Sequence, residues 1–185
     1  MTVPPQQAAM PVIARPALVT PYIDSSVFIA HIKRETTLAA NGSPRFEITK
    51  HIFEGAEQKK YQIYTSFFTL AEVRRMQHGT KPISGPELVD INAMFNKYLQ
   101  NEFLLPIELS REVGEKAQSL GAAYGIKPGD AVHLASAVVA KCNVLLVWDK
   151  ESWTRHMPAN GMIDGVFVSE PYWEGIVAMP IVAAT

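Results

Sequence analysis

Four acidic side chains could together bind a metal ion: Asp24, Glu72, Asp130 and Asp149. Asp24 ends the apolar run 17–23 and Asp149 ends the run 144–148, whereas the other two lie near the start of helix-like segments. Carboxylates gathered in one place repel each other unless a cation compensates their charge. Oxygen ligands without cysteine or histidine at zinc-binding spacing suit Mg²⁺ or Mn²⁺. The four residues therefore predict a divalent metal site.

Each of these residues also has a structural interpretation, because carboxylates cap helices. Thr69 and Glu72 match a capping box, with Thr69 as N-cap and Glu72 bonded back to its backbone N–H. Asp130 would be favoured at a helix start by the helix dipole. Asp24 could cap the helix after the first strand, and Asp149 could cap the short turn 150–152. Capping does not exclude metal binding, and the origin of the acids in four different elements favours a metal site.

The elements that would position these acids alternate between short apolar runs and longer amphipathic ones, which is typical of α/β proteins. Strands are predicted near residues 18–23, 62–66, 103–106, 144–147 and 165–168. Helices are predicted at 26–39, from a Ser43 cap and Pro44 to about 59, after Thr69, at about 86–101, from Ser110 to a stop at Gly125, and at about 129–141. In an open parallel sheet, strand ends and the following helix starts share the edge where ligands bind. We therefore expect the acids at one edge.

The composition limits the class of protein. The chain has 185 residues, 48% of them hydrophobic, and a formal charge of −1, which predicts one globular domain with no global attraction to nucleic acid. Its single cysteine, Cys142, excludes an intrachain disulfide and favours a cytoplasmic protein with a buried thiol. No apolar run approaches the roughly 18 residues of a membrane helix. No P-loop, dinucleotide-binding or nucleophile-elbow motif occurs.

The sequence divides into three parts. Residues 1–16 carry four prolines without periodicity, which predicts a flexible N-terminal tail. Residues 17–170 contain all the predicted helices and strands and form the expected domain. Residues 171–185 are apolar for a C-terminus, so this extension is expected to pack on the domain or to bind a partner.

Four blocks of the sequence resemble the PIN-domain nucleases, in the order in which that family has them. The blocks are YIDSSVFIA (residues 22–30), TSFFTLAEV (65–73), GDAVHLASA (129–137) and LLVWDK (145–150). They cover about residues 17–156, and within the family they most resemble the VapC-type toxins of bacterial type II toxin–antitoxin modules. The resemblance implies a three-layer α/β/α fold with a central, mainly parallel sheet of four to five strands, here as a nuclease domain over residues 17–170.

The resemblance assigns roles to the acidic residues. Asp24, Glu72 and Asp130 match three acids of the family and Asp149 matches the fourth, so all four are expected to be catalytic and to bind metal. The sequence departs from the family two residues before the fourth acid, where a frequent Thr is replaced by Val147. Loss of that hydroxyl would weaken the support of the metal site, which makes Asp149 the least secure ligand.

Other polar residues near the blocks are candidates for contacts with substrate. Ser25 or Ser26 matches a small hydroxyl position of the family that would contact a water on the metal or a phosphate. Arg74 and Arg75 follow the second acid and would either face a phosphate or remain solvated. For His133, three residues after the third acid, packing with hydrogen bonds is favoured over a role as general base.

The activity implied by the resemblance is hydrolysis of RNA phosphodiester bonds by an endoribonuclease with one or two Mg²⁺ or Mn²⁺ ions. A toxin of this type would pair with an antitoxin protein, and a cytoplasmic homodimer without membrane attachment is expected. Two alternatives stay open. One is a catalytically silent PIN-like binding module, and the other is an RNA-processing or DNA-structure nuclease that has no antitoxin.

Overall fold

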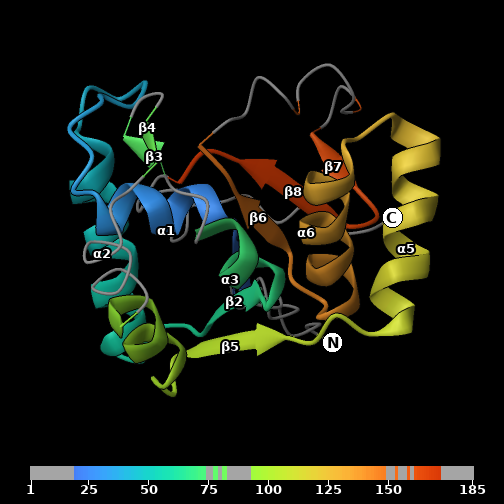
Figure 1. Ribbon diagram of the computed structural model, residues 1–185, viewed down its shortest axis with the longest axis horizontal. Helices are drawn as coiled ribbons and strands as arrows, with labels where there is room; N and C mark the ends of the chain where they lie inside the picture. The colour runs from blue at the N-terminus through green and yellow to red at the C-terminus, as the bar shows by residue number, and fades with distance from the viewer. Residues whose placement is uncertain are drawn as a thin grey trace, which may run out of the picture.

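A parallel sheet forms the centre of the protein. The computed structural model describes residues 19–73, 77–78, 81–82, 93–148, 153, 158 and 161–171. Within these ranges six strands pair in the order β5-β2-β1-β6-β8-β7, all parallel except the antiparallel pair β7–β8 (Figure 1). The strands are β1 (Pro21–Ile23), β2 (Ile63–Ser66), β5 (Leu104–Ile107), β6 (Val144–Leu146), β7 (Met162–Ile163) and β8 (Val166–Ser169). A separate antiparallel pair joins β3 (Gln77–His78) to β4 (Lys81–Pro82).

Helices cover both faces of this sheet. On one side lie α1 (Ser25–Ile32), α2 (Arg45–Glu57) and the helical residues 93–99, and on the other lie α5 (Arg111–Tyr124) and α6 (Pro128–Val139) (Figure 1). Successive strand residues face opposite sides, so Ile23 and Leu146 pack toward α1 and α2, whereas Tyr22 and Leu145 pack toward α5 and α6. The predicted three-layer α/β/α fold with a mainly parallel sheet is confirmed.

The register of the sheet brings the strand ends to one level. Tyr22 of β1 lies opposite Tyr64 of β2 and Leu145 of β6, and Leu145 lies opposite Val168 of β8. Helix α1 begins two residues after β1 ends, and the short helix α3 (Phe68–Val73) begins two residues after β2 ends. The helix starts after these strands therefore lie at the carboxyl edge of the sheet, where parallel folds bind ligands.

Helix α5 follows its sequence signals closely. The Ser110 hydroxyl accepts a hydrogen bond from the Val113 N–H at 3.3 Å, and Gly125 ends the helix with a left-handed φ of 67°. Val113, Ala117 and Leu120 are buried against α6 and the sheet. The predicted boundaries and apolar face of this helix are confirmed.

The end of α1 and the start of α2 both differ from their predictions. Helix α1 stops at Ile32, because Arg34 turns the chain with a φ of 49°. Ser43 does not cap α2: its N–H donates to the Asn41 side chain, and Pro44 occupies the N-cap position without a side-chain hydrogen bond. Pro44 also forms a bridge with Leu38, so these residues belong to a turn before the helix.

Three further predictions have mixed outcomes. Strand β7 was not predicted, because its two residues are too few to carry a pattern. Of the helix predicted at 86–101, only 93–99 is helical within the described part of the chain, and 83–92 lie outside it. Cys142 is buried, which raises the pKa of its thiol to about 12 and confirms the inert thiol.

The predicted terminal extensions lie almost wholly outside the described residues, since 1–18 and 172–185 are not described. The division at residues 16 and 171 therefore stays a prediction. Within the described ranges, none of the helices combines the length and hydrophobicity that a bilayer-spanning segment requires.

Candidate active site

Asp24 lies between β1 and α1 at the carboxyl edge. Its backbone N–H donates to the Leu146 carbonyl at 3.1 Å, which ties it to the end of β6. Its Oδ1 accepts the Ser26 N–H at 2.6 Å, so the predicted capping role is confirmed. Its second oxygen, Oδ2, lies 3.7 Å from His133 Nε2 of α6. One carboxylate oxygen of Asp24 therefore caps α1, while the other faces α6.

Glu72 reaches the same place from α3, but the capping-box interpretation was wrong. The helix begins at Phe68, whose N–H donates to Ser66 Oγ, and Thr69 lies inside it with its hydroxyl 2.9 Å from that of Thr65. Glu72 instead directs Oε2 at His133 Nε2, 2.6 Å away. Ser66, at the end of β2, binds the first N–H of the helix, so α3 begins before Thr69. Glu72 therefore lies one turn along α3, opposite α6.

His133 joins the two carboxylates to the sheet. The ring is 1% exposed; its Nε2 faces Glu72 and Asp24, and its Nδ1 lies 2.8 Å from the Tyr22 hydroxyl. Facing two carboxylates, Nε2 carries a proton, and in the neutral ring Nδ1 accepts the hydrogen bond that Tyr22 donates. Burial lowers the pKa of His133, but the hydrogen bond to Glu72 and the charge of Asp24 outweigh it, so the pKa is raised. The expected packed, hydrogen-bonded histidine is confirmed.

Asp130 completes the group from the first turn of α6. Partial burial raises the pKa of its carboxyl above the usual value, and the negative charges of Asp24 and Glu72 raise it further. Lys127, at the N-cap of α6, opposes this shift. The carboxylates of Asp24 and Glu72 thus act electrostatically on that of Asp130.

Gly129 determines how closely α3 approaches α6. A Cβ at this position would lie 3.3 Å from Glu72 Oε1 and 3.5 Å from the Phe68 ring. Any larger residue would therefore displace Glu72 or Phe68 by a few tenths of an ångström. The sequence carried this signal as the Gly-Asp pair at the start of the predicted helix, but its importance depends on a contact between α3 and α6 that spacing alone does not reveal.

The donor set fits a hard divalent cation. Within the described residues, no group of three or more His, Cys, Asp or Glu side chains is placed so that it could hold a metal ion. Mg²⁺ does not need such a group, because it usually keeps several waters and binds through one or two carboxylates. The carboxylate oxygens of Asp24, Glu72 and Asp130 are of the type that such a cation prefers as ligands.

Of the remaining residues singled out near the site, some lie within the described part of the chain and others lie outside it. Ser25 is buried, and Ser26 Oγ accepts the Trp148 N–H at 3.1 Å, which holds the end of β6 against α1. Val147 is 1% exposed and packs in the core toward α5 and α6. Asp149, Arg74 and Arg75 lie outside the described residues, so their roles stay predictions.

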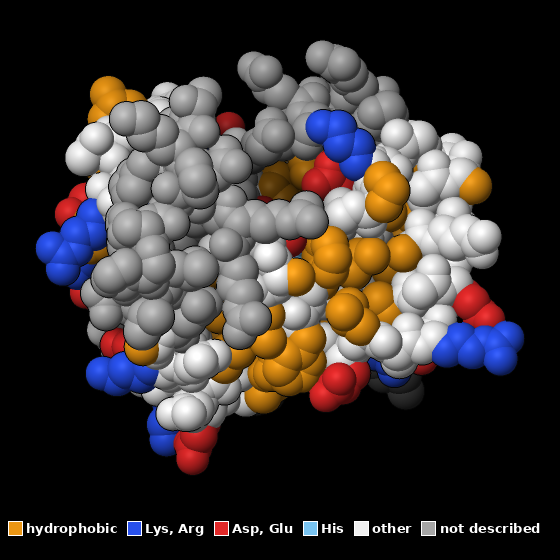
Figure 2. Space-filling model, in the orientation of Figure 1, with side chains coloured by type: hydrophobic (Ala, Val, Ile, Leu, Met, Phe, Trp, Pro, Cys, Tyr) orange, Lys and Arg blue, Asp and Glu red, His pale blue; other side chains and the backbone are white. Residues whose placement is uncertain are grey.

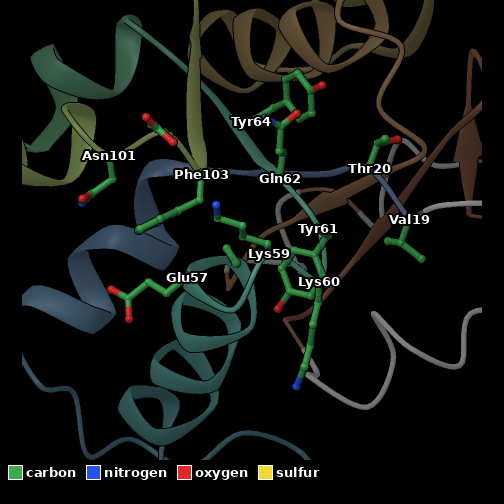
Figure 3. Close-up of a pocket in the computed structure, with 12 residues that line it drawn as sticks. Val19, Thr20, Glu57, Lys59, Lys60, Tyr61, Gln62, Tyr64, Asn101 and Phe103 are labelled. Carbon is green, nitrogen blue, oxygen red and sulfur yellow. The ribbon is translucent and has the colours of Figure 1, made fainter.

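The surface around the carboxyl edge is mixed in charge. In the upper part of the face shown in Figure 2, acidic side chains lie recessed beside a basic side chain and hydrophobic side chains. A separate cavity of about 690 Å³ lies at the opposite, amino edge of the sheet, where Thr20, Lys60 and Phe103 line it ahead of β1, β2 and β5 (Figure 3). The cavity contains none of the predicted site residues.

Comparisons with known proteins agree with this arrangement. Three solved structures are similar: a toxin–antitoxin complex from Klebsiella pneumoniae (18% identity, TM-score 0.55, covering 83% of this chain and 98% of that one), VapBC2 from Rickettsia felis bound to a promoter DNA fragment (13%, 0.56, 82% and 98%), and Mycobacterium tuberculosis VapC20, a toxin that cleaves the sarcin–ricin loop (13%, 0.53, 78% and 98%). The TM-scores show a shared fold, and at these low identities the likeness shows the fold alone. No curated protein matches the sequence.

A family model decides the classification. The model of the PIN domain matches residues 22–155, which is well over half of the chain and includes Asp24, Glu72, Asp130 and Asp149. The matched segment begins in β1 and extends past β6, so it contains every element that places the carboxylates. The chain is a member of the PIN domain family.

Proposed function

We propose that this protein is a metal-dependent endoribonuclease and the toxin of a toxin–antitoxin pair. The observation that carries the proposal is the meeting of Asp24, Glu72 and Asp130 around the buried His133. Membership of the PIN domain family supports nuclease chemistry. The likeness to toxin–antitoxin complexes, and to a toxin that cleaves the sarcin–ricin loop, supports the toxin role and RNA as substrate.

The chemistry follows from what each residue can hold. Asp24, Glu72 and Asp130 would bind Mg²⁺ or Mn²⁺, with Asp149 as a fourth ligand. Such a cation lowers the pKa of water and neutralises negative charge on a phosphodiester. Each of two carboxylates uses one oxygen within the protein: Asp24 Oδ1 holds the Ser26 N–H, and Glu72 Oε2 holds His133 Nε2. The carboxylates are thereby oriented before substrate arrives, which is the condition for electrostatic catalysis.

The test is cleavage of a mixed RNA pool by the purified protein in Mg²⁺, Mn²⁺ or EDTA. We expect cleavage only with metal, and Asp24→Asn and Asp130→Asn should lower it about 100-fold or more, since outer partners of a metal site alone account for roughly 10–100-fold. Asp164→Asn is the matched control: Asp164 pairs with Lys116 on the surface, and Asn tolerates its φ of 48°.

Two outcomes would overturn the proposal. Folded wild-type protein that is inert with both metals would point to a binding module, and cleavage that continues in EDTA would remove the role of metal. The toxin role is tested with the same variants in bacteria. Induced wild-type protein should arrest growth, whereas Asp24→Asn should not, and equal growth of the two strains would contradict a toxin.

A further inference from the structure

Arg45 is held against the ring of Trp148. Its guanidinium carbon lies 4.9 Å from the centroid of the indole, and Trp148 is only 4% exposed. Stacking of this kind orients the flat guanidinium and holds its positive charge in place. The Arg45 side chain remains 26% exposed, so part of the fixed cation faces solvent.

This pair lies at the carboxyl edge of the sheet. Helix α2 ends at Glu57, ahead of the amino end of β2, so its first residue, Arg45, lies toward the opposite edge. The Trp148 N–H donates to Ser26 Oγ at 3.1 Å, and the Ser26 N–H donates to Asp24 Oδ1 at 2.6 Å. A continuous chain of contacts thus connects the stacked guanidinium to the carboxylate cluster.

The donors of Arg45 are incompletely used. Nη1 lies 3.6 Å from Glu35 Oε1, which is longer than a good hydrogen bond. Within the described residues, Arg45 Nε and Trp148 Nε1 are both buried without an acceptor. Buried N–H groups are usually paired, so the fold keeps this stack despite two unmade hydrogen bonds. A guanidinium has five N–H donors in a planar fork that matches phosphate oxygens.

We infer that Arg45, oriented by Trp148, binds a backbone phosphate of RNA beside the carboxylate cluster. This inference rests on the proposed nuclease function. A cluster of carboxylates repels a polyanion beyond the reach of its own metal, so a fixed cation on the flank is needed to hold the strand. Lys127, at the start of α6, lies on the other side of the cluster and opposes the charge of the acids there. The strand would pass between these two cations.

The experiment measures binding of a labelled single-stranded RNA by fluorescence anisotropy, in Ca²⁺ to neutralise the carboxylates and over a series of KCl concentrations. The proteins are full-length wild type, Arg45→Ala, Arg45→Lys and the control Arg111→Ala, which removes an exposed arginine paired with Glu115 on α5. We expect Arg45→Ala to weaken binding about tenfold and to reduce the salt slope by about 0.7, the loss of one phosphate contact. Arg45→Lys should keep the slope and lose part of the affinity, and Arg111→Ala should match wild type.

A merely structural Arg45 would give a different result. If Arg45→Ala is folded but binds RNA with the affinity and salt slope of wild type, Arg45 only supports Trp148 and the inference fails. If wild-type protein binds RNA through Arg45 but does not cleave it with Mg²⁺ or Mn²⁺, the inference holds and the nuclease proposal fails. If wild-type protein does not bind RNA at all, both fail.

Discussion

At the scale of single residues, the site depends on which polar atoms pair with one another. His133 uses Nδ1 for the Tyr22 hydroxyl and Nε2 for Glu72, so both ring nitrogens have a partner in a nearly dry environment. A fully paired buried network of this kind rigidifies its members. The consequence for function is that Glu72 cannot rotate freely, and its position is determined by the histidine and by Gly129.

Gly129 provides the sharpest test at this scale. In Gly129→Ala the new Cβ would press on Glu72 Oε1 from 3.3 Å. We expect Mn²⁺ affinity to fall about tenfold, measured by calorimetry, while stability does not fall, because Ala favours a helix over Gly by up to about 1 kcal/mol. Gly114→Ala on α5 is the control, since its Cβ would meet nothing within 4 Å. Equal metal affinities in the two variants would contradict the close-approach argument.

The acids could be found from the sequence, but their partners could not. Asp24 and Asp130 were identifiable because they stand at a strand end and in the first turn of a helix, and Glu72 because it follows a predicted helix start at Thr69, although it lies one turn along α3. The pairing of Glu72 with His133 joins residues 61 positions apart and depends on which face each helix turns inward. Local rules favoured the capping box for Glu72, because they consider only the four residues of one helix start.

At the scale of elements, α1 and α2 form a layer that contains a second, partly buried histidine. His31 Nε2 lies 2.7 Å from the Tyr98 hydroxyl, and its ring packs against Phe46 and Phe53. Burial, followed by the nearby charge of Arg34, lowers the pKa of His31 from 6.5 to about 4. The folded protein therefore holds this histidine neutral over a range where the unfolded chain takes up a proton.

The stability of this layer should depend on pH in a defined direction. Because the folded pKa is depressed, the contribution of His31 is present above 6.5, declines below it and is lost by about 4. We predict that the free energy of unfolding falls more between about pH 7 and about pH 5 in wild type than in His31→Gln. Urea denaturation at both pH values measures this, with His51→Gln, a half-exposed histidine on α2, as control. Parallel losses in wild type and His31→Gln would refute it.

Element boundaries show where sequence rules hold. Helix α5 has a serine cap and a glycine stop, and both act as the local rules predict. Helix α2 starts after a turn that pairs Pro44 with Leu38, and this contact displaces the cap expected at Ser43. Local signals fix a boundary only where no neighbouring segment offers the backbone another partner.

At the scale of the whole molecule, the carboxyl and amino edges of the parallel sheet carry different features. The carboxyl edge collects the carboxylates, because β1 and β2 end level with one another and helices start there. The amino edge holds the cavity lined by Thr20, Lys60 and Phe103, far from the predicted chemistry (Figure 3). The alternation of short apolar runs and longer amphipathic runs predicted an α/β protein, and the resemblance to the PIN-domain nucleases supplied the three-layer arrangement.

Calorimetric titration of the metal-free protein with Mn²⁺ tests the claim that the carboxylate edge binds a divalent cation. We predict saturable binding of one or two ions to wild type and to the control Asp164→Asn. Asp130→Asn should bind at least about tenfold more weakly, because a carboxylate ligand is lost. Equal Mn²⁺ binding by Asp130→Asn and wild type, or no binding by either, would contradict the claim.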